Sequence, residues 1–122
     1  LYPHPFACFD HHLSNGGFAM HNFVDTGSAA TAELLAGLFL DAGIAIDPVS
    51  AQALYTGIMT DTGQFRFAST SQRVFALAGE LLARGANPAQ AGQELYERES
   101  LGKLRLLQHF IGSLRLECGG RV

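Results

Sequence analysis

The stretch FVDTGSAATAELLAGLFLDA, residues 23–42, contains a change in apolar spacing that decides the class of fold. Phe23 and Val24 form a short apolar run, which is too short for a helix and is typical of a buried strand. After Gly27 the apolar residues recur every third or fourth position, which predicts a helix up to Ala42 that Gly43 ends. A strand that runs directly into a helix indicates an α/β fold.

The same two patterns continue on both sides of this stretch. Upstream, residues 5–9 form a second short apolar run, which predicts a strand that closes on Asp10, His11 and His12. Downstream, the patterns predict helices over residues 48–62, 72–84, 88–98 and 101–113. Their expected starts are Asp47-Pro48, one of Ser69, Thr70 and Ser71, Asn87-Pro88, and Ser100. Residues 65–67 alternate as a short strand or extended loop would, and residues 114–118 alternate as a strand would.

The charges of the chain are unevenly distributed. The 122 residues have a formal net charge of −3, but residues 1–65 contain six acids, no Lys and no Arg. All eight basic residues follow, with five acids, so the two parts carry −6 and +3. No basic stripe of the kind found in DNA-coating proteins is present. An acidic part with four of the five histidines favours a cation site instead.

Cysteine usage and hydropathy set the expected environment. The two cysteines share no short spacing, so they form neither a CxxC redox pair nor a zinc framework. No apolar run approaches the roughly 18 residues that span a membrane. We therefore expect a cytoplasmic protein without membrane contact. The chain begins on Leu1 rather than Met, and we expect it to start within a longer protein.

Three acidic motifs are candidates for chemistry. Asp10-His11-His12 follows a predicted strand and suits a divalent metal, with Asp10 fixing a histidine tautomer; a surface His pair in a turn is the alternative. Asp61 opposes the dipole at a helix end, a cost that a metal would relieve. Asp25 and Asp61 each begin an Asp-Thr-Gly triplet, as in aspartic proteases. That enzyme class is disfavoured, because it needs an all-β lobe and both triplets adjoin predicted helices.

Taken together, DHHLSN at 10–15, VDTGSAATAEL at 24–34 and YTGIMTDTGQFRF at 55–67 resemble the DHH phosphoesterases. The resemblance is greatest to the bacterial group that degrades very short RNA and dephosphorylates phosphoadenosine phosphate. It implies a site with two Mn²⁺ ions, for which Mg²⁺ or Co²⁺ can substitute, and a bridging water that attacks phosphorus.

The resemblance also implies roles for individual residues. His11 and Asp61 would be metal ligands, and His12 would contact the phosphate during catalysis. Asp10 would be a supporting acid of the catalytic motif, and Asn15 would assist at the substrate. Arg66, between two phenylalanines, could clamp a phosphate beside a stacked base, although a half-buried strand with Arg66 facing solvent is the preferred interpretation.

The resemblance further divides the chain. Residues 1–98 would be the C-terminal part of a DHH-type parallel-sheet domain whose upstream metal motifs lie outside the chain. Residues 99–122 would be a linker helix and the first strand of a second, substrate-binding domain. We therefore expect a two-metal phosphoesterase of short single-stranded oligonucleotides or nucleotide phosphates, of which this chain is a fragment that is inactive alone. The alternative is a non-catalytic nucleotide- or protein-binding module of the same fold. A homodimer through an open sheet edge is a further expectation.

Overall fold

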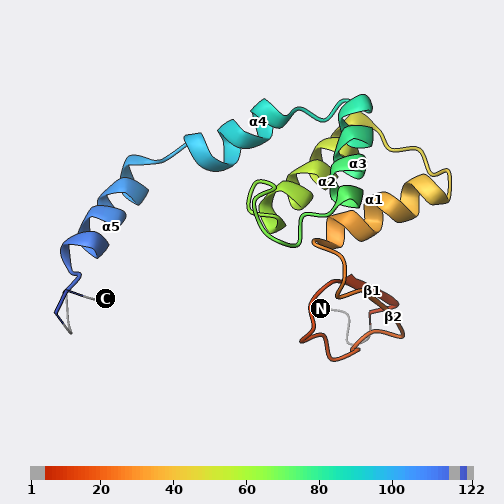
Figure 1. Cartoon of the computed structure of the whole chain (residues 1–122), viewed down its shortest axis with the longest axis horizontal. Coiled ribbons are helices and arrows are strands. Elements are labelled where there is room, and N and C mark those ends of the chain that lie inside the picture. The colour runs from red at the N-terminus through yellow and green to blue at the C-terminus, as the bar shows by residue number, and fades with distance from the viewer. Residues whose placement is uncertain (1–4, 116–118, 121–122) are drawn as a thin grey trace. The chain divides into compact units, whose positions relative to one another are not determined.

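The computed structural model describes residues 5–115 and 119–120 of the chain (Figure 1). The chain divides into two compact units, Leu1–Ala91 and Gly92–Val122. The predicted domain boundary between residues 98 and 99 stays a prediction.

The first unit begins with a small parallel sheet. Strand β1 (Ala7–Asp10) pairs with β2 (His21–Val24), with Ala7 opposite His21 and Asp10 opposite Val24. The rings of Phe9 and Phe23 stack across the pair at a centroid distance of 4.8 Å. Because the strands are parallel, their carboxyl ends meet at one edge of the sheet. The residues that follow both strands therefore share that edge.

Three helices follow the sheet, α1 (Thr31–Asp41), α2 (Pro48–Asp61) and α3 (Gln72–Ala83). The side chain of Asp47 accepts the N–H of Ser50 and caps α2, with Pro48 at the first helical position. Ser71 accepts the N–H of Val74 and caps α3. Both predicted start signals are confirmed.

The N-terminus of α1 has a different capping interaction. Its N-cap residue, Ala30, has no side-chain acceptor for the first N–H groups of the helix. The buried carboxylate of Glu33 instead reaches back to accept the N–H of Ala29, one residue before the N-cap, at 2.6 Å.

The core lies among these three helices. All three contribute completely buried apolar side chains, which together with Ala30, directly before α1, are Ala36, Ala51, Ile58, Val74 and Leu81. Gly57 on α2 lets α1 approach closely, because a Cβ at this position would lie 2.8 Å from the Cβ of Ala32. Tyr55 and Met59 are also buried, so α2 contributes a full face to the core and ends with Asp61 at the surface.

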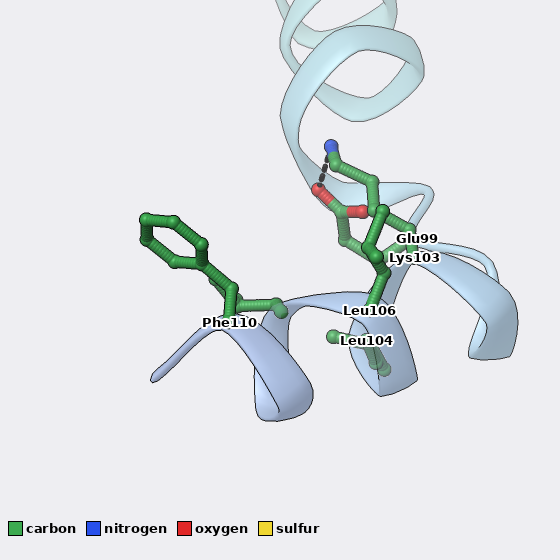
Figure 2. A pocket seen from close by; sticks show the side chains of 6 residues that line it. Glu99, Lys103, Leu104, Leu106 and Phe110 are labelled. Carbon is green, nitrogen blue, oxygen red and sulfur yellow. Dashed lines mark hydrogen bonds and ion pairs between the residues drawn. The ribbon is translucent and has the colours of Figure 1, made fainter. Parts of the chain in front are cut away.

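Short helical segments follow α3. Helix α4 (Pro88–Gly92), of which only Gly92 belongs to the second unit, continues into a π-helical turn, η1 (Gln93–Glu97), so the segment predicted as one helix changes its hydrogen-bond pattern at residue 93. Helix α5 (Leu101–Gly112) is capped by Ser100, as expected. A groove of about 520 Å³ lies along α5 between the Glu99–Lys103 ion pair and Phe110 (Figure 2).

The structure confirms the α/β class with a parallel sheet and corrects one local prediction. Residues 65–67 form neither a strand nor an extended loop but part of a tight turn. Gln64 and Phe65 have φ values of 61° and 63°, in the left-handed region that a strand does not visit. The strand expected over residues 114–118 falls partly on residues 116–118, which lie outside the described residues. None of the helices in the described part of the chain is long and apolar enough to cross a membrane.

Candidate functional site

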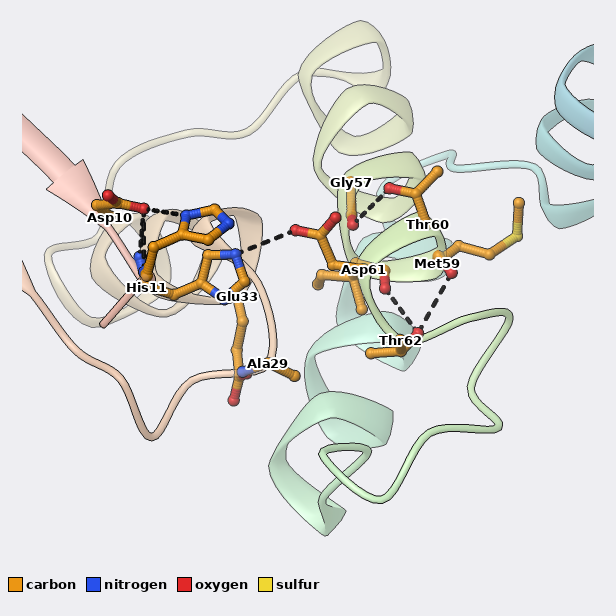
Figure 3. A network of polar contacts seen from close by, with 11 residues as sticks. Asp10, His11, Ala29, Glu33, Gly57, Met59, Thr60, Asp61 and Thr62 are labelled. Atoms are coloured by element: carbon orange, nitrogen blue, oxygen red, sulfur yellow. Dashed lines mark hydrogen bonds and ion pairs between the residues drawn. The ribbon is translucent and has the colours of Figure 1, made fainter. Parts of the chain in front are cut away.

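Asp10, the last residue of β1, organises the loop that follows it. Its Oδ1 accepts the N–H groups of His11 and His12, at 2.7 and 3.1 Å. The same oxygen lies 2.7 Å from Nδ1 of His12. Asn15 donates its Nδ2 to the second oxygen, Oδ2, at 2.7 Å. Both oxygens of the carboxylate are thus engaged by donors, and Figure 3 shows the contacts of Oδ1.

These donors change the acidity of Asp10. The amide of Asn15 and the ring of His12 hold the pKa of the carboxyl far below its ordinary value. Asp10 is therefore ionised at neutral pH and acts only as an acceptor. The proton of the His12–Asp10 contact then belongs to Nδ1 of His12, which leaves Nε2 of the exposed ring available to another partner.

Asn15 has a structural role in this loop that the sequence did not reveal. Besides bonding Asp10, it accepts the N–H of Gly17 with its Oδ1 at 2.8 Å, so both ends of its amide are engaged. The sequence pattern that could have pointed to this bond is an amide residue, Asn15, five positions after an acid, Asp10, at the end of a strand. Its expected contact with a substrate stays a prediction.

His11 and Asp61 come together from distant parts of the chain. Nε2 of His11 lies 3.5 Å from Oδ2 of Asp61, the last residue of α2 (Figure 3). The His11 side chain is mostly buried and that of Asp61 is 41% exposed, so the pair opens to solvent on the carboxylate side. The loop after β1 and the C-terminus of α2 thus form one site.

The donor set of this pair fits a divalent cation in part. Imidazole nitrogen with carboxylate oxygen suits Mn²⁺ and its neighbours. Two donors held about 2.1 Å from one ion are themselves roughly 3.0–3.5 Å apart, which matches the observed pair. Within residues 5–115 and 119–120, however, no three His, Cys, Asp or Glu side chains are grouped closely enough to hold an ion. The described residues therefore supply two donors, fewer than two ions need.

The two Asp-Thr-Gly triplets occupy separate environments. Asp25 follows β2 and accepts the Ser28 hydroxyl at 2.8 Å and the N–H of Gly27 at 3.0 Å. These contacts, with the charge of Arg73, lower the pKa of Asp25 below its ordinary value. Asp61 instead faces His11. The two carboxylates do not share a hydrogen bond, so the arrangement of an aspartic protease is not formed.

Among the described residues, no hydrogen bond or ion pair joins Arg66 to the Asp10 loop. Its Nε donates to the carbonyl of Gly63 at 2.8 Å, within the turn that follows Asp61. The guanidinium is exposed. Its expected contact with a substrate stays a prediction.

Comparison with known proteins gives several relatives that share one name. No model of a known protein family matches the chain. The chain is 35% identical, over 91% of its length, to the bifunctional oligoribonuclease and PAP phosphatase NrnA of Thermus thermophilus. It is 30% identical, over 72% of its length, to the protein of that name from Bacillus subtilis. The aligned parts make up 34% and 29% of those proteins, so the chain spans about a third of their length.

A solved structure agrees with these sequence matches. The chain superposes on an exopolyphosphatase-related protein from Bacteroides fragilis with a TM-score of 0.79 and 28% sequence identity. The match covers 89% of this chain and 33% of that protein.

Proposed function

The chain belongs to the DHH phosphoesterase family, and we propose that its His11–Asp61 pair is part of a divalent-metal site that hydrolyses phosphoester bonds in short oligonucleotides or nucleotide phosphates. The observation that carries this proposal is the 3.5 Å approach of Nε2 of His11 to Oδ2 of Asp61. These two residues lie in two of the three motifs that resemble the family, and folding places them side by side.

Mn²⁺ is the ion that we propose for this pair, with Mg²⁺ or Co²⁺ as substitutes. When bound, such an ion polarises a phosphoryl oxygen and lowers the pKa of a coordinated water. His11 and Asp61 would hold it. The further donors that a two-ion site needs are not among the described residues.

His12 is the residue that we propose to contact the phosphate. Because Asp10 holds the proton on Nδ1, the second nitrogen, Nε2, is the one that meets the ligand. Protonated there, His12 would donate a hydrogen bond to a phosphate oxygen. Asp10 stabilises the charged imidazole, and Asn15 keeps Asp10 in place.

Metal binding gives the first test of the proposal. With Mn²⁺ at about 100 times its Kd, binding to the folded state adds about 2.7 kcal/mol of stability, which raises the Tm by roughly 10 °C for a domain of this size. We expect this rise in the wild-type chain and not in His11→Ala or Asp61→Asn. His21→Ala and Asp41→Asn serve as matched controls, because they remove a histidine and an acid elsewhere in the first unit, and they should keep the rise.

Hydrolysis gives the second test. We expect the full-length protein to cleave a diribonucleotide in the presence of Mn²⁺, and His11→Ala or Asp61→Ala to abolish this activity. Full activity in either variant contradicts the proposal. The 122-residue chain alone should turn over weakly or not at all, because its described residues supply only two donors. Nucleotide binding without any response to Mn²⁺ would favour a non-catalytic module of the same fold.

A further inference from the structure

The turn over residues 62–68, directly after Asp61, is held in an unusual conformation. Two consecutive non-glycine residues, Gln64 and Phe65, adopt φ values of 61° and 63°. Side chains with a Cβ rarely take this conformation, and it persists only where the surrounding structure enforces it.

Several contacts enforce this turn. The buried hydroxyl of Thr62 accepts the N–H of Phe65 at 3.1 Å, and the carbonyl of Thr62 accepts the N–H groups of Arg66 and Phe67, both at 3.0 Å. Gly63 has no side chain, and a Cβ there would overlap the ring of Phe67. The turn is therefore a fixed feature with the Phe67 ring packed over Gly63.

The turn places its three central side chains in different environments. Phe65 points into the core, where its ring lies 5.9 Å from that of Tyr55. Phe67 remains 56% exposed although it packs on Gly63. Arg66 is exposed, and its Nε bonds the carbonyl of Gly63, which orients the guanidinium and leaves its other N–H groups unused by the described residues. In the described part of the chain, Arg66 has no carboxylate at ion-pair distance.

We propose that Arg66 and Phe67 form a nucleotide subsite, in which the Phe67 ring stacks on a base and the Arg66 guanidinium donates to the adjoining phosphate. An exposed aromatic ring beside a planar cation is the combination that binds single-stranded nucleic acid, and the guanidinium fork matches phosphate oxygens. The subsite rests on the proposed function and deepens it. A base-stacking ring selects nucleotides over phosphate chains that carry no base.

The experiment uses two probes that differ only in their bases, with binding measured by isothermal titration calorimetry. The first is a 5′-phosphorylated diribonucleotide, and the second has the same sugar-phosphate backbone with both bases removed. Both are titrated into the 122-residue chain. Because stacking on an aromatic ring contributes about 1–3 kcal/mol per base, Phe67→Leu should weaken the base-containing probe at least about fivefold. The leucine keeps apolar bulk over Gly63, and an unchanged Tm confirms that the turn survives.

The variants separate the two parts of the subsite. Phe67→Leu should leave the probe without bases within about twofold of its wild-type affinity, whereas Arg66→Gln should weaken both probes alike. Phe110→Leu, which changes an exposed phenylalanine on α5, is the matched control and should change neither.

Three results overturn the subsite: equal binding of both probes by the wild-type chain, wild-type affinities in Phe67→Leu, or no binding of either probe. None of these results concerns the rise in Tm with Mn²⁺ and its loss in the His11 and Asp61 variants. That measurement tests the proposed function separately.

Discussion

At the scale of single residues, Thr62 shows how one buried hydroxyl shapes the surface beside the site. It is completely buried, donates to the carbonyl of Ile58 at 2.7 Å and accepts the N–H of Phe65 at 3.1 Å. The first bond ties it to the last turn of α2, and the second fixes the left-handed conformation of the following residues. Asp61 and Arg66 are thus positioned by a buried side chain that bonds the backbone on both sides of it.

We predict that Thr62→Val destabilises the protein by about 1–3 kcal/mol, because the N–H of Phe65 loses its acceptor inside the fold. Valine keeps the volume of threonine, so the loss measures the hydroxyl. Urea denaturation of the purified chain gives the free energy of unfolding. Thr62→Ser retains the hydroxyl and should lose less than Thr62→Val. An unchanged unfolding free energy in Thr62→Val would show that the turn does not depend on this bond.

At the scale of elements, α2 connects a cap at one end to the candidate metal ligand at the other. The N–H of Ser50 donates to Asp47 and lowers the pKa of that carboxyl below its ordinary value of 3.8. Because the folded-state pKa is the lower one, Asp47 contributes stability above about pH 4, and this contribution is lost as the pH falls through the folded-state pKa. Lowering the pH should therefore destabilise α2, beginning at its N-terminal turn.

We predict that Asp47→Asn removes this part of the pH dependence. Asparagine still caps a helix, but it does not titrate. Between pH 5 and the acid limit of folding, the unfolding free energy should fall less steeply with decreasing pH in Asp47→Asn than in the wild type. Urea midpoints at several pH values measure the two slopes. Parallel curves would show that Asp47 binds protons equally in the folded and unfolded states, so that the cap does not contribute to the pH dependence of stability.

Elements whose signals are local could be predicted from sequence, and those that depend on the fold could not. Asp47, Ser71 and Ser100 cap helices because of bonds within four residues, so their patterns were sufficient. The alternation around Arg66 is the same in a strand and in this turn. The turn depends instead on packing between Gly63 and Phe67 and on the acceptors of Thr62, which no periodicity encodes.

The candidate site shows the same division. The family resemblance implied that His11 and Asp61 are both metal ligands, but their 3.5 Å separation requires the folded loop and helix. The bond from Asn15 to Asp10 was missed, because the amide reaches back five residues to a strand end.

At the scale of the whole molecule, folding brings a basic residue from residues 66–122 near an acid from residues 1–65, although every Lys and Arg follows residue 65 in the sequence. Asp10, Asp25 and Asp61 all belong to the part of the chain without Lys or Arg. In space, however, Arg73 at the start of α3 is near enough to Asp25 to lower its pKa. The separation of charge along the sequence is thus not complete in the fold, because a cation from the basic part acts on Asp25.

The two units also differ in how their helices are stabilised. Leu81 is completely buried among the helices of the first unit, whereas no described residue of α5 is buried. A helix of 12 residues without burial is marginal in water. We predict that Leu81→Ala lowers the protection of α1–α3 amides by about 2–5 kcal/mol and leaves α5 unchanged. Hydrogen exchange by mass spectrometry measures both. Slow exchange in α5 that is lost in Leu81→Ala would show instead that α5 draws its stability from the core of the first unit.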